Sequence, residues 1–334
     1  MQDARDTPVD ETPQDALERE RDLADVVVAD DVAPSGARKL RIATYNIHKG
    51  VTSRRNRIHD LRAGLHALEA DVVFLQEVQG RNDQHAERFD NWPEIAQHTF
   101  LAGDKWAEAA YGRNSVRDDG DHGNALLSRF KLIAHENIDI SDHRFESRGL
   151  LHSEIEVEGI RVHCICAHLG LFEKGRARQA DAMVARIRSH VPADAPLIIA
   201  GDFNDWRHRL GKGLVERLGV REVFSDSETK AAAIRRRAGE RIGAINAQLP
   251  RVIGAPLEAA AKSVSTVVPA KRTGRIAEPA RTFPSGFPLL RLDRMYVRGF
   301  AIASAQVLSG PTWRKLSDHA PILAELVFDL PKTT

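Results

Sequence analysis

The chain has 334 residues, 42% of them hydrophobic, which is enough to bury one large core. It contains no apolar run of roughly 18 residues or more, and no basic segment followed by an apolar one at its N-terminus, which argues against a membrane-spanning helix and a secretory signal. We therefore expect a soluble, cytoplasmic protein, and a monomer.

The formal net charge of +1 conceals two segments of opposite sign. Residues 1–37 carry 11 Asp or Glu and 3 Arg without hydrophobic periodicity, which predicts an acidic disordered tail. Residues 230–281 carry 11 Lys or Arg and 3 Glu. We expect residues 38–334 to form one domain that contains this second segment as a basic insertion.

The first predicted elements are a strand, a helix and a second strand. Side chains alternate in character over residues 41–46 and Gly50 follows, which predicts a strand that ends in a loop. Residues 58–69 repeat leucine and isoleucine at helical spacing. Residues 71–75 form a short apolar run, which predicts a buried strand with Glu77 at its end.

Strands dominate the rest of the pattern. Apolar runs predict an antiparallel meander at residues 124–127, 131–140, 149–156 and 161–168. A helix is expected at 172–190, a buried strand at 196–200, and the last strands at 292–297, 301–308 and 322–328. The order is neither strict βαβ alternation nor all-β, so we expect a mixed α/β fold.

Within the basic insertion, apolar residues between positions 234 and 249 recur at spacings of three and four, next to several arginines. This pattern predicts a basic amphipathic helix that ends at Pro250.

The two cysteines, Cys164 and Cys166, lie two positions apart on a predicted strand. Their side chains therefore share one face and cannot easily bridge. We expect both to be reduced, buried and structural.

Polar residues recur where apolar strands end. A single Asp in such a place is usually a turn residue or a helix cap, but here the pattern repeats through the chain. The set consists of Asn46, Glu77, His168, Asp202, Asn204, Asp293, Asp318 and His319. Strand ends meet at one edge of a sheet, and carboxylate and amide oxygens suit a hard cation such as Mg²⁺ or Mn²⁺ better than zinc.

The motifs Gly-Asp-Phe-Asn at 201–204 and Ser-Asp-His at 317–319, with Tyr-Asn-Ile-His at 45–48 and Leu-Gln-Glu-Val at 75–78, occur in one specific order. From about residue 40 to 330 the chain thereby resembles the endonuclease/exonuclease/phosphatase superfamily, which includes DNase I. The resemblance implies an α/β fold: a DNase I-like four-layer α/β sandwich, in which two mixed β-sheets pack face to face with flanking helices. It also implies a catalytic domain at residues 38–334.

The resemblance implies metal ligands as well. Glu77 would bind Mg²⁺ or Mn²⁺, and Asn46 and Asp318 would help directly or through water. A cation in this place stabilises the charge that develops on a phosphoryl group.

Five further residues resemble the catalytic groups of the superfamily. His319 would act as general base or contact the phosphate, and Asp293 would orient its ring. Asp202 would handle a proton, Asn204 would hold the phosphate, and His168 would donate to it from the other side.

Four residues are candidates for contacts with substrate. Arg148, in Ser-Arg-Gly, resembles a phosphate-contacting arginine of DNase I-type enzymes, but a surface ion pair explains it equally well. His48, His122 and Asn124 are expected near the same edge.

The class of phosphate ester stays open at this point. We favour a phosphodiesterase that acts on nucleic acid, because an arginine-rich insertion can neutralise phosphates. The alternative is a sphingomyelinase-like phosphodiesterase or a phosphatase at a membrane surface, because a basic amphipathic helix can also bind anionic lipid at the periphery of a membrane. A non-catalytic binding module is a remote third reading, because every principal polar residue is present.

Overall fold

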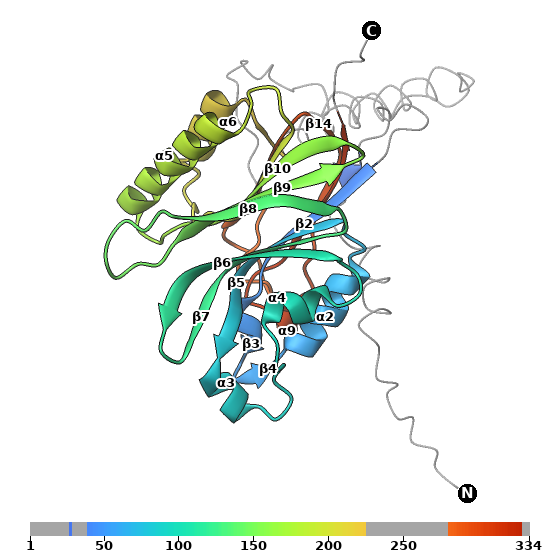
Figure 1. The fold of residues 1–334 in the computed structure, drawn as a ribbon, viewed down its shortest axis with the longest axis vertical. Helices are drawn as coiled ribbons and strands as arrows, with labels where there is room; N and C mark the ends of the chain where they lie inside the picture. The colour runs from blue at the N-terminus through green and yellow to red at the C-terminus, as the bar shows by residue number, and fades with distance from the viewer. Residues whose placement is uncertain (1–26, 29–38, 225–279, 329–334) are drawn as a thin grey trace, which may run out of the picture. The chain divides into compact units, whose positions relative to one another are not determined.

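The computed structural model describes residues 27–28, 39–224 and 280–328, which belong to one compact unit (Figure 1). The basic insertion, apart from its last two residues, lies outside the described residues, as does the helix predicted within it. Of the acidic tail expected at 1–37, only Val27–Val28 are described, and they form the short strand β1.

The first sheet has seven strands. In spatial order these are β1 (Val27–Val28), β14 (Phe300–Val307), β15 (Ile322–Phe328), β2 (Lys39–Asn46), β5 (Val72–Asn82), β7 (Gly120–Ser128) and β6 (Glu108–Arg117). Only β2 and β5 run parallel, and the other neighbours are antiparallel. The sheet is therefore mixed.

The second sheet has six strands. In spatial order these are β12 (Arg221–Glu222), β13 (Asp293–Arg298), β11 (Leu197–Asp202), β10 (Ile160–His168), β9 (Gly149–Val157) and β8 (Lys131–Asp139). Here β10 and β11 form the parallel pair. Strands β8, β9 and β10 form the predicted meander, but β7 does not belong to it. The chain changes sheets between Ser128 and Lys131, and β7 pairs with β5 and β6 instead.

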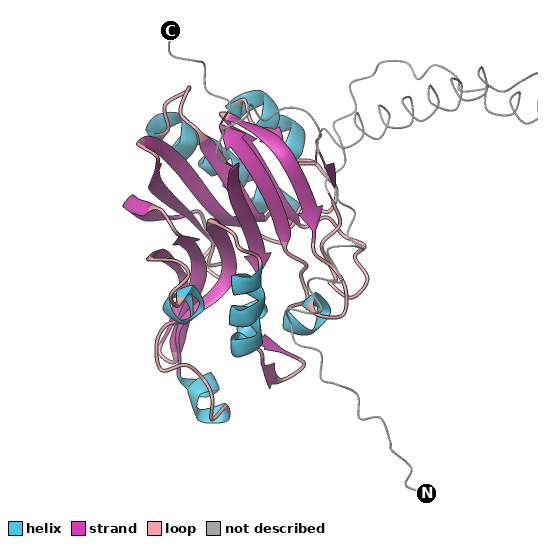
Figure 2. Cartoon of the chain, turned by 90° about the vertical axis from the view of Figure 1, so that its right-hand side faces the viewer, coloured by secondary structure: helices cyan, strands magenta, loops and turns pink. Residues whose placement is uncertain are grey.

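Helices cover the outer face of each sheet, so the molecule has the predicted α/β/β/α layers (Figures 1 and 2). The second sheet packs against α5 (Glu173–His190) and α6 (Gly211–Leu218). The first sheet packs against α2 (Ile58–Ala67), α4 (Gln97–Ala102) and α9 (Trp313–Leu316). A third apolar layer, between the two sheets, contains Cys164 and Cys166, both free and fully buried as expected.

Short elements complete the connections. They are the 3₁₀ helix η1 (His48–Gly50), the hairpin of β3 (Val51–Thr52) and β4 (Arg55–Asn56), and α3 (Asp83–Arg88). Among the residues that the structure describes, no helix is long and apolar enough to cross a membrane.

Glu222 is an unusual residue of this fold, because its carboxylate is buried at the edge of the second sheet. Its Oε2 accepts a hydrogen bond of 2.8 Å from the backbone N–H of Phe224, and its Oε1 has no partner among the described residues. Burial raises the pKa of Glu222 to about 7 from its ordinary 4.5, although the charge of Arg294 opposes the shift.

This shift predicts a pH-dependent stability. The folded protein keeps a proton that the unfolded chain releases, so the free energy of unfolding falls as the pH rises from 4.5 toward about 7. We therefore expect the free energy of unfolding of Glu222→Gln, relative to that of the wild type, to increase by about 2 kcal/mol as the pH rises from roughly 5 to 8. Urea unfolding at each pH measures this difference. Glu216→Gln, on the exposed surface of α6, is the control and should follow the wild type. Parallel curves for Glu222→Gln and the wild type would contradict the assignment.

Candidate active site

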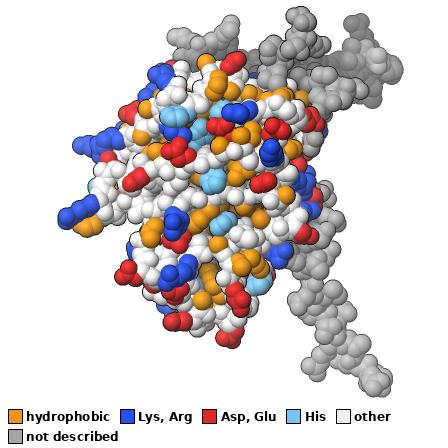
Figure 3. All heavy atoms as spheres, viewed as in Figure 1, with side chains coloured by type: hydrophobic (Ala, Val, Ile, Leu, Met, Phe, Trp, Pro, Cys, Tyr) orange, Lys and Arg blue, Asp and Glu red, His pale blue; other side chains and the backbone are white. Residues whose placement is uncertain are grey.

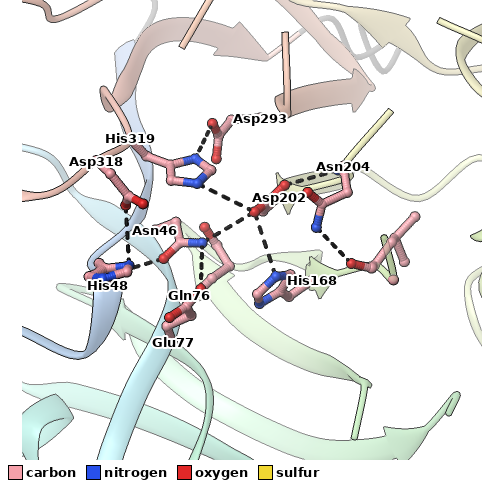
Figure 4. Close-up of polar contacts among 12 residues, drawn as sticks. Asn46, His48, Gln76, Glu77, His168, Asp202, Asn204, Asp293, Asp318 and His319 are labelled. Carbon is pink, nitrogen blue, oxygen red and sulfur yellow. Dashed lines mark hydrogen bonds and ion pairs between the residues drawn. The ribbon is translucent and has the colours of Figure 1, made fainter. Parts of the chain in front are cut away.

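The site forms at one edge of the two sheets, where four strands bring polar side chains together (Figure 4). Asn46 ends β2, His168 ends β10 and Asp202 ends β11. Asp293 begins β13 instead of ending it, because β13 runs antiparallel to β11 and pairs Asp293 with Asp202. All four residues are buried.

Asp202 lies at the centre of this cluster. Its Oδ2 accepts a hydrogen bond of 3.2 Å from Asn46 Nδ2 and lies 3.6 Å from His168 Nε2 and 3.8 Å from His319 Nε2. Its Oδ1 accepts a hydrogen bond of 2.9 Å from the backbone N–H of Asn204. Burial raises the pKa of Asp202 to about 6, and the charge of Asp293 adds to the effect. One carboxylate therefore links four of the predicted site residues.

His319 is oriented by Asp293. The ring Nδ1 lies 2.8 Å from Asp293 Oδ2, which leaves Nε2 on the side of Asp202. Asp293 Oδ1 is buried without a hydrogen-bond partner in the described structure. Burial alone would lower the pKa of His319, but Asp293 and Asp202 raise it to about 10. The imidazole is therefore a cation held between two carboxylates.

His168 differs from His319 in its surroundings. Burial, together with the nearby charge of Arg148, lowers its pKa to about 3, so its ring is neutral. The ring lies on the other side of Asp202 from His319 (Figure 4). The site thus contains one cationic and one neutral imidazole beside the same carboxylate.

Glu77 lies at a bulge and not at the end of a strand as predicted. β5 continues to Asn82, and its register with β7 shifts between Leu75 and Val78. Glu77 has a φ of 57°, and its Oε1 accepts a hydrogen bond of 3.3 Å from Asn46 Nδ2. Burial would raise the pKa of Glu77, but the positive charge of Lys49 and the hydrogen bond from Asn46 lower it below its ordinary value. The side chain is therefore an anion, and it is half-buried.

Backbone strain marks the same edge. His48, Lys49, Glu77 and Asn204 all adopt positive φ values, between 46° and 59°. This conformation is costly for residues other than glycine and concentrates at functional sites. These four are among nine non-glycine residues of the described chain that have positive φ.

The donor set fits a divalent cation. Asn46 connects Glu77 to Asp202, and Ser317 Oγ donates to the Asn46 carbonyl at 2.7 Å and lies 3.3 Å from Asp318 Oδ1. A second group with metal-binding capacity consists of Asp202, Asp293 and His319, whose ligand atoms lie within 4.8 Å of one another. The unpartnered Asp293 Oδ1 is a further oxygen available to a cation.

The candidate substrate contacts lie at different depths. His48 is exposed, and its Nδ1 lies 3.3 Å from Asp318 Oδ1. His122 is half-buried near Glu77 and Arg148, whose charges act on its pKa, although burial is the main cause that lowers it. Arg148 Nε is buried and has no hydrogen-bond partner among the described groups.

Asn124 occupies a structural position. It is fully buried, and its Nδ2 donates to the carbonyls of Gly149 at 2.9 Å and Cys166 at 3.3 Å, so it ties β7 to the second sheet. Contact with substrate at Asn124 stays a prediction, which this burial disfavours. The Nδ2 of Asn204 likewise donates a hydrogen bond of 2.9 Å to the carbonyl of Leu169.

Two residues of the site had no assigned role in the sequence analysis. Ser317 is buried beneath Asn46 and belongs to the Ser-Asp-His motif, which was the available signal. Phe283 places its ring 5.0 Å from the His319 ring, and no pattern in the sequence indicates this contact.

Comparisons with known proteins agree with this architecture. Residues 43–319 match the sequence model of the Endonuclease/Exonuclease/phosphatase family. The chain is 37% identical over 291 residues to the Uncharacterized protein YbhP of Escherichia coli (strain K12), an alignment that covers 86% of this chain and 96% of YbhP.

Solved structures with the same fold include two that contain a bound molecule. The human Nocturnin catalytic domain with bound sulfate anion has a TM-score of 0.59 at 17% identity, over 92% of this chain and 98% of that one. D. rerio TDP2 complexed with single strand DNA product has a TM-score of 0.50 at 18% identity, over 86% of this chain and 98% of that one. Likeness at this level of identity supports the fold alone.

Proposed function

The chain belongs to the endonuclease/exonuclease/phosphatase family, whose members generally hydrolyse phosphate esters, and on that basis we propose that it is a divalent-metal-dependent phosphodiesterase. The proposal rests on the groups that surround the Asp202 carboxylate. Two imidazoles and one amide converge on its Oδ2 at a strained, polar edge of the sheets. Groups so arranged can hold an anionic phosphate and move a proton beside it.

Glu77 would hold the cation, with Asn46 and Asp318 beside it. This assignment is supported by the ionised state of Glu77, and Asn46 lies beside it because its Nδ2 donates to Glu77 Oε1 at 3.3 Å. When bound, Mg²⁺ or Mn²⁺ would neutralise charge on the phosphoryl oxygens.

The side chains around Asp202 bind the phosphate and transfer protons. His319 is a cation fixed by Asp293, so its Nε2 presents an N–H donor to the phosphate. His168 presents its Nε2 from the opposite side. Asp202 lies between them and transfers the proton of the water or of the leaving group.

Two substrate classes remain candidates. Nucleic acid is supported by the fold shared with D. rerio TDP2, a protein described in complex with a single-stranded DNA product. A lipid headgroup is supported by exposed apolar side chains on loops beside the site.

The test of the proposed activity uses a soluble substrate. Wild-type protein with Mg²⁺ or Mn²⁺ should hydrolyse bis(p-nitrophenyl) phosphate, and EDTA should abolish the turnover, which Mg²⁺ or Mn²⁺ should restore. Plasmid DNA, RNA, anionic phospholipid vesicles and inositol phosphates are then compared at the same metal concentration. Absence of metal-dependent turnover with every substrate would contradict the proposal.

Asp202→Asn removes the central charge and keeps the shape of the side chain. Because an amide cannot take the proton, we expect kcat for bis(p-nitrophenyl) phosphate to fall by about 100-fold. Asp181→Asn, on the exposed side of α5, is the matched control and should keep full activity. Equal activity of the two variants would remove Asp202 from the mechanism.

A further inference from the structure

Exposed apolar side chains gather on loops beside the active site. We call six of them the apolar rim: Phe145, Leu171, Phe172, Trp206, Phe287 and Leu289. The three phenylalanines are 80%, 73% and 72% exposed, respectively. Large apolar groups rarely remain in water without a partner when they cluster on one face.

Three loops of the rim are tied to one another. The β8–β9 loop carries Phe145, and its Glu146 accepts a hydrogen bond of 2.7 Å from Gln179 Nε2. Gln179 also accepts one of 2.7 Å from the N–H of Gly170, next to Leu171. Arg176 donates to the Leu171 carbonyl at 2.6 Å and lies 4.9 Å above the ring of Trp206. These contacts hold the three loops next to one another.

The fourth segment of the rim flanks His319. The backbone N–H groups of Leu289 and Leu290 donate to the Phe283 carbonyl, and the Phe283 ring contacts His319. The N–H of Ser285 donates to the Asp318 carbonyl at 2.8 Å. Phe287 and Leu289 thus project from a turn that is anchored on the active site itself.

Basic side chains are interleaved with the rim. The Arg144 guanidinium lies 4.4 Å from the centroid of the Phe145 ring, and Lys174 follows Phe172 on the exposed first turn of α5. In Figure 3, basic and apolar side chains lie together at the tip of the protrusion on the left, where Figure 1 draws the β8–β9 loop. Exposed aromatic and aliphatic groups mixed with cations are typical of surfaces that enter the headgroup region of an anionic bilayer.

Resting on the phosphodiesterase activity proposed above, we infer that the apolar rim docks the protein on an anionic membrane surface, so that its substrate is a phosphate ester of a lipid headgroup. The position of the rim supports this reading, because docking there presents the site to the headgroup layer. Single-stranded nucleic acid is the competing occupant, since aromatic side chains stack on bases. It fits less well, because Leu171 and Leu289 have no ring on which a base could stack.

Binding is measured by sedimentation with vesicles of equal parts phosphatidylcholine and phosphatidylglycerol. The triple variant Phe145→Ser, Phe172→Ser, Phe287→Ser should weaken vesicle binding by about 100-fold or more, because each substitution removes much of the transfer energy of a phenylalanine. Vesicles of phosphatidylcholine alone should bind the wild type about tenfold less tightly. The control is Ile133→Ser, an exposed apolar residue on β8 away from the β8–β9 loop, which should leave binding unchanged.

A second readout is independent of any loss of folding. Of the four tryptophans, Trp206 is the exposed one, so its emission should shift to the blue when vesicles are added to the wild type. Trp206→Phe keeps an aromatic group in the rim and should bind vesicles without this shift.

Turnover of bis(p-nitrophenyl) phosphate by the same preparations separates the two proposals. The triple variant should keep this activity and lose hydrolysis of vesicle phospholipid. If the wild type hydrolyses bis(p-nitrophenyl) phosphate but does not bind vesicles, the docking proposal is wrong and the proposed phosphodiesterase activity is retained. Rim-dependent binding of a single-stranded oligonucleotide, without vesicle binding, would assign the rim to nucleic acid instead.

Discussion

His319→Ala should reduce kcat/KM for bis(p-nitrophenyl) phosphate by about 10⁴-fold, or about 5 kcal/mol of transition-state stabilisation. The substitution removes the imidazole that lies 3.8 Å from Asp202 and leaves the buried carboxylate of Asp293 without its 2.8 Å partner. Both the positive charge beside the phosphate and the orientation of the proton-transfer group are lost. Steady-state kinetics at saturating Mg²⁺ measures the effect.

The matched control is His135→Ala, which removes an exposed histidine from β8 and should change kcat/KM by less than about twofold. His319→Gln serves as a second variant, because its side chain can still donate to Asp293 if the alanine variant is unstable. Metal-dependent activity retained by both variants would show that His319 takes no part in catalysis. A wild type without any turnover would support the binding-module reading instead.

The strands of the site were predictable because their apolar runs are continuous. β10 and β11 are buried on both faces, and their ends at His168 and Asp202 follow directly from where the apolar run stops. The order of polar residues along the chain then indicated a common edge. It could not indicate that Asp293 begins its strand, since strand direction depends on pairing with β11, which is a contact between distant segments.

The position of Glu77 within its strand could not be predicted from the sequence. The apolar run of β5 stops at Leu75, and the mostly polar residues up to Asn82 resemble a loop, yet they continue the strand by pairing with β7. The bulge that turns Glu77 toward Asn46 follows from this pairing and has no local signature. The strand β6 was missed for a related reason: alanine, glycine and polar residues over Glu108–Arg117 give no clear alternation.

The apolar rim could not be found from sequence motifs. Its residues lie on loops next to the strand ends of the active site, and a single exposed apolar residue gives no signal in the sequence. Only the contacts of Gln179, Arg176 and Phe283 bring the separate loops beside the site. The sequence pattern indicates membrane contact through the basic insertion, most of which lies outside the described residues, whereas the rim belongs to the same compact unit as the site.

Glu77→Gln should raise the Mn²⁺ concentration needed for half-maximal activity by about 100-fold or more, because it replaces an anionic ligand by a neutral one of the same shape. Neighbouring groups lower the pKa of Glu77, so the wild-type carboxylate is charged at neutral pH and the substitution removes a full charge. Direct titration with Mn²⁺ by calorimetry separates lost metal affinity from lost chemistry. Glu87→Gln, an exposed residue of α3, is the control.

The Glu77→Gln experiment also distinguishes between two possible locations of the cation. Asp202, Asp293 and His319 also bring three ligand atoms within 4.8 Å of one another. If the cation were held there, Asp293→Asn would weaken Mn²⁺ binding and Glu77→Gln would not. If Glu77 holds it, Glu77→Gln should weaken binding strongly, whereas Asp293→Asn should lower kcat through the misplaced His319 ring and leave the affinity for Mn²⁺ within about threefold of the wild type. The pair of variants therefore assigns the metal to one side of Asp202 or the other.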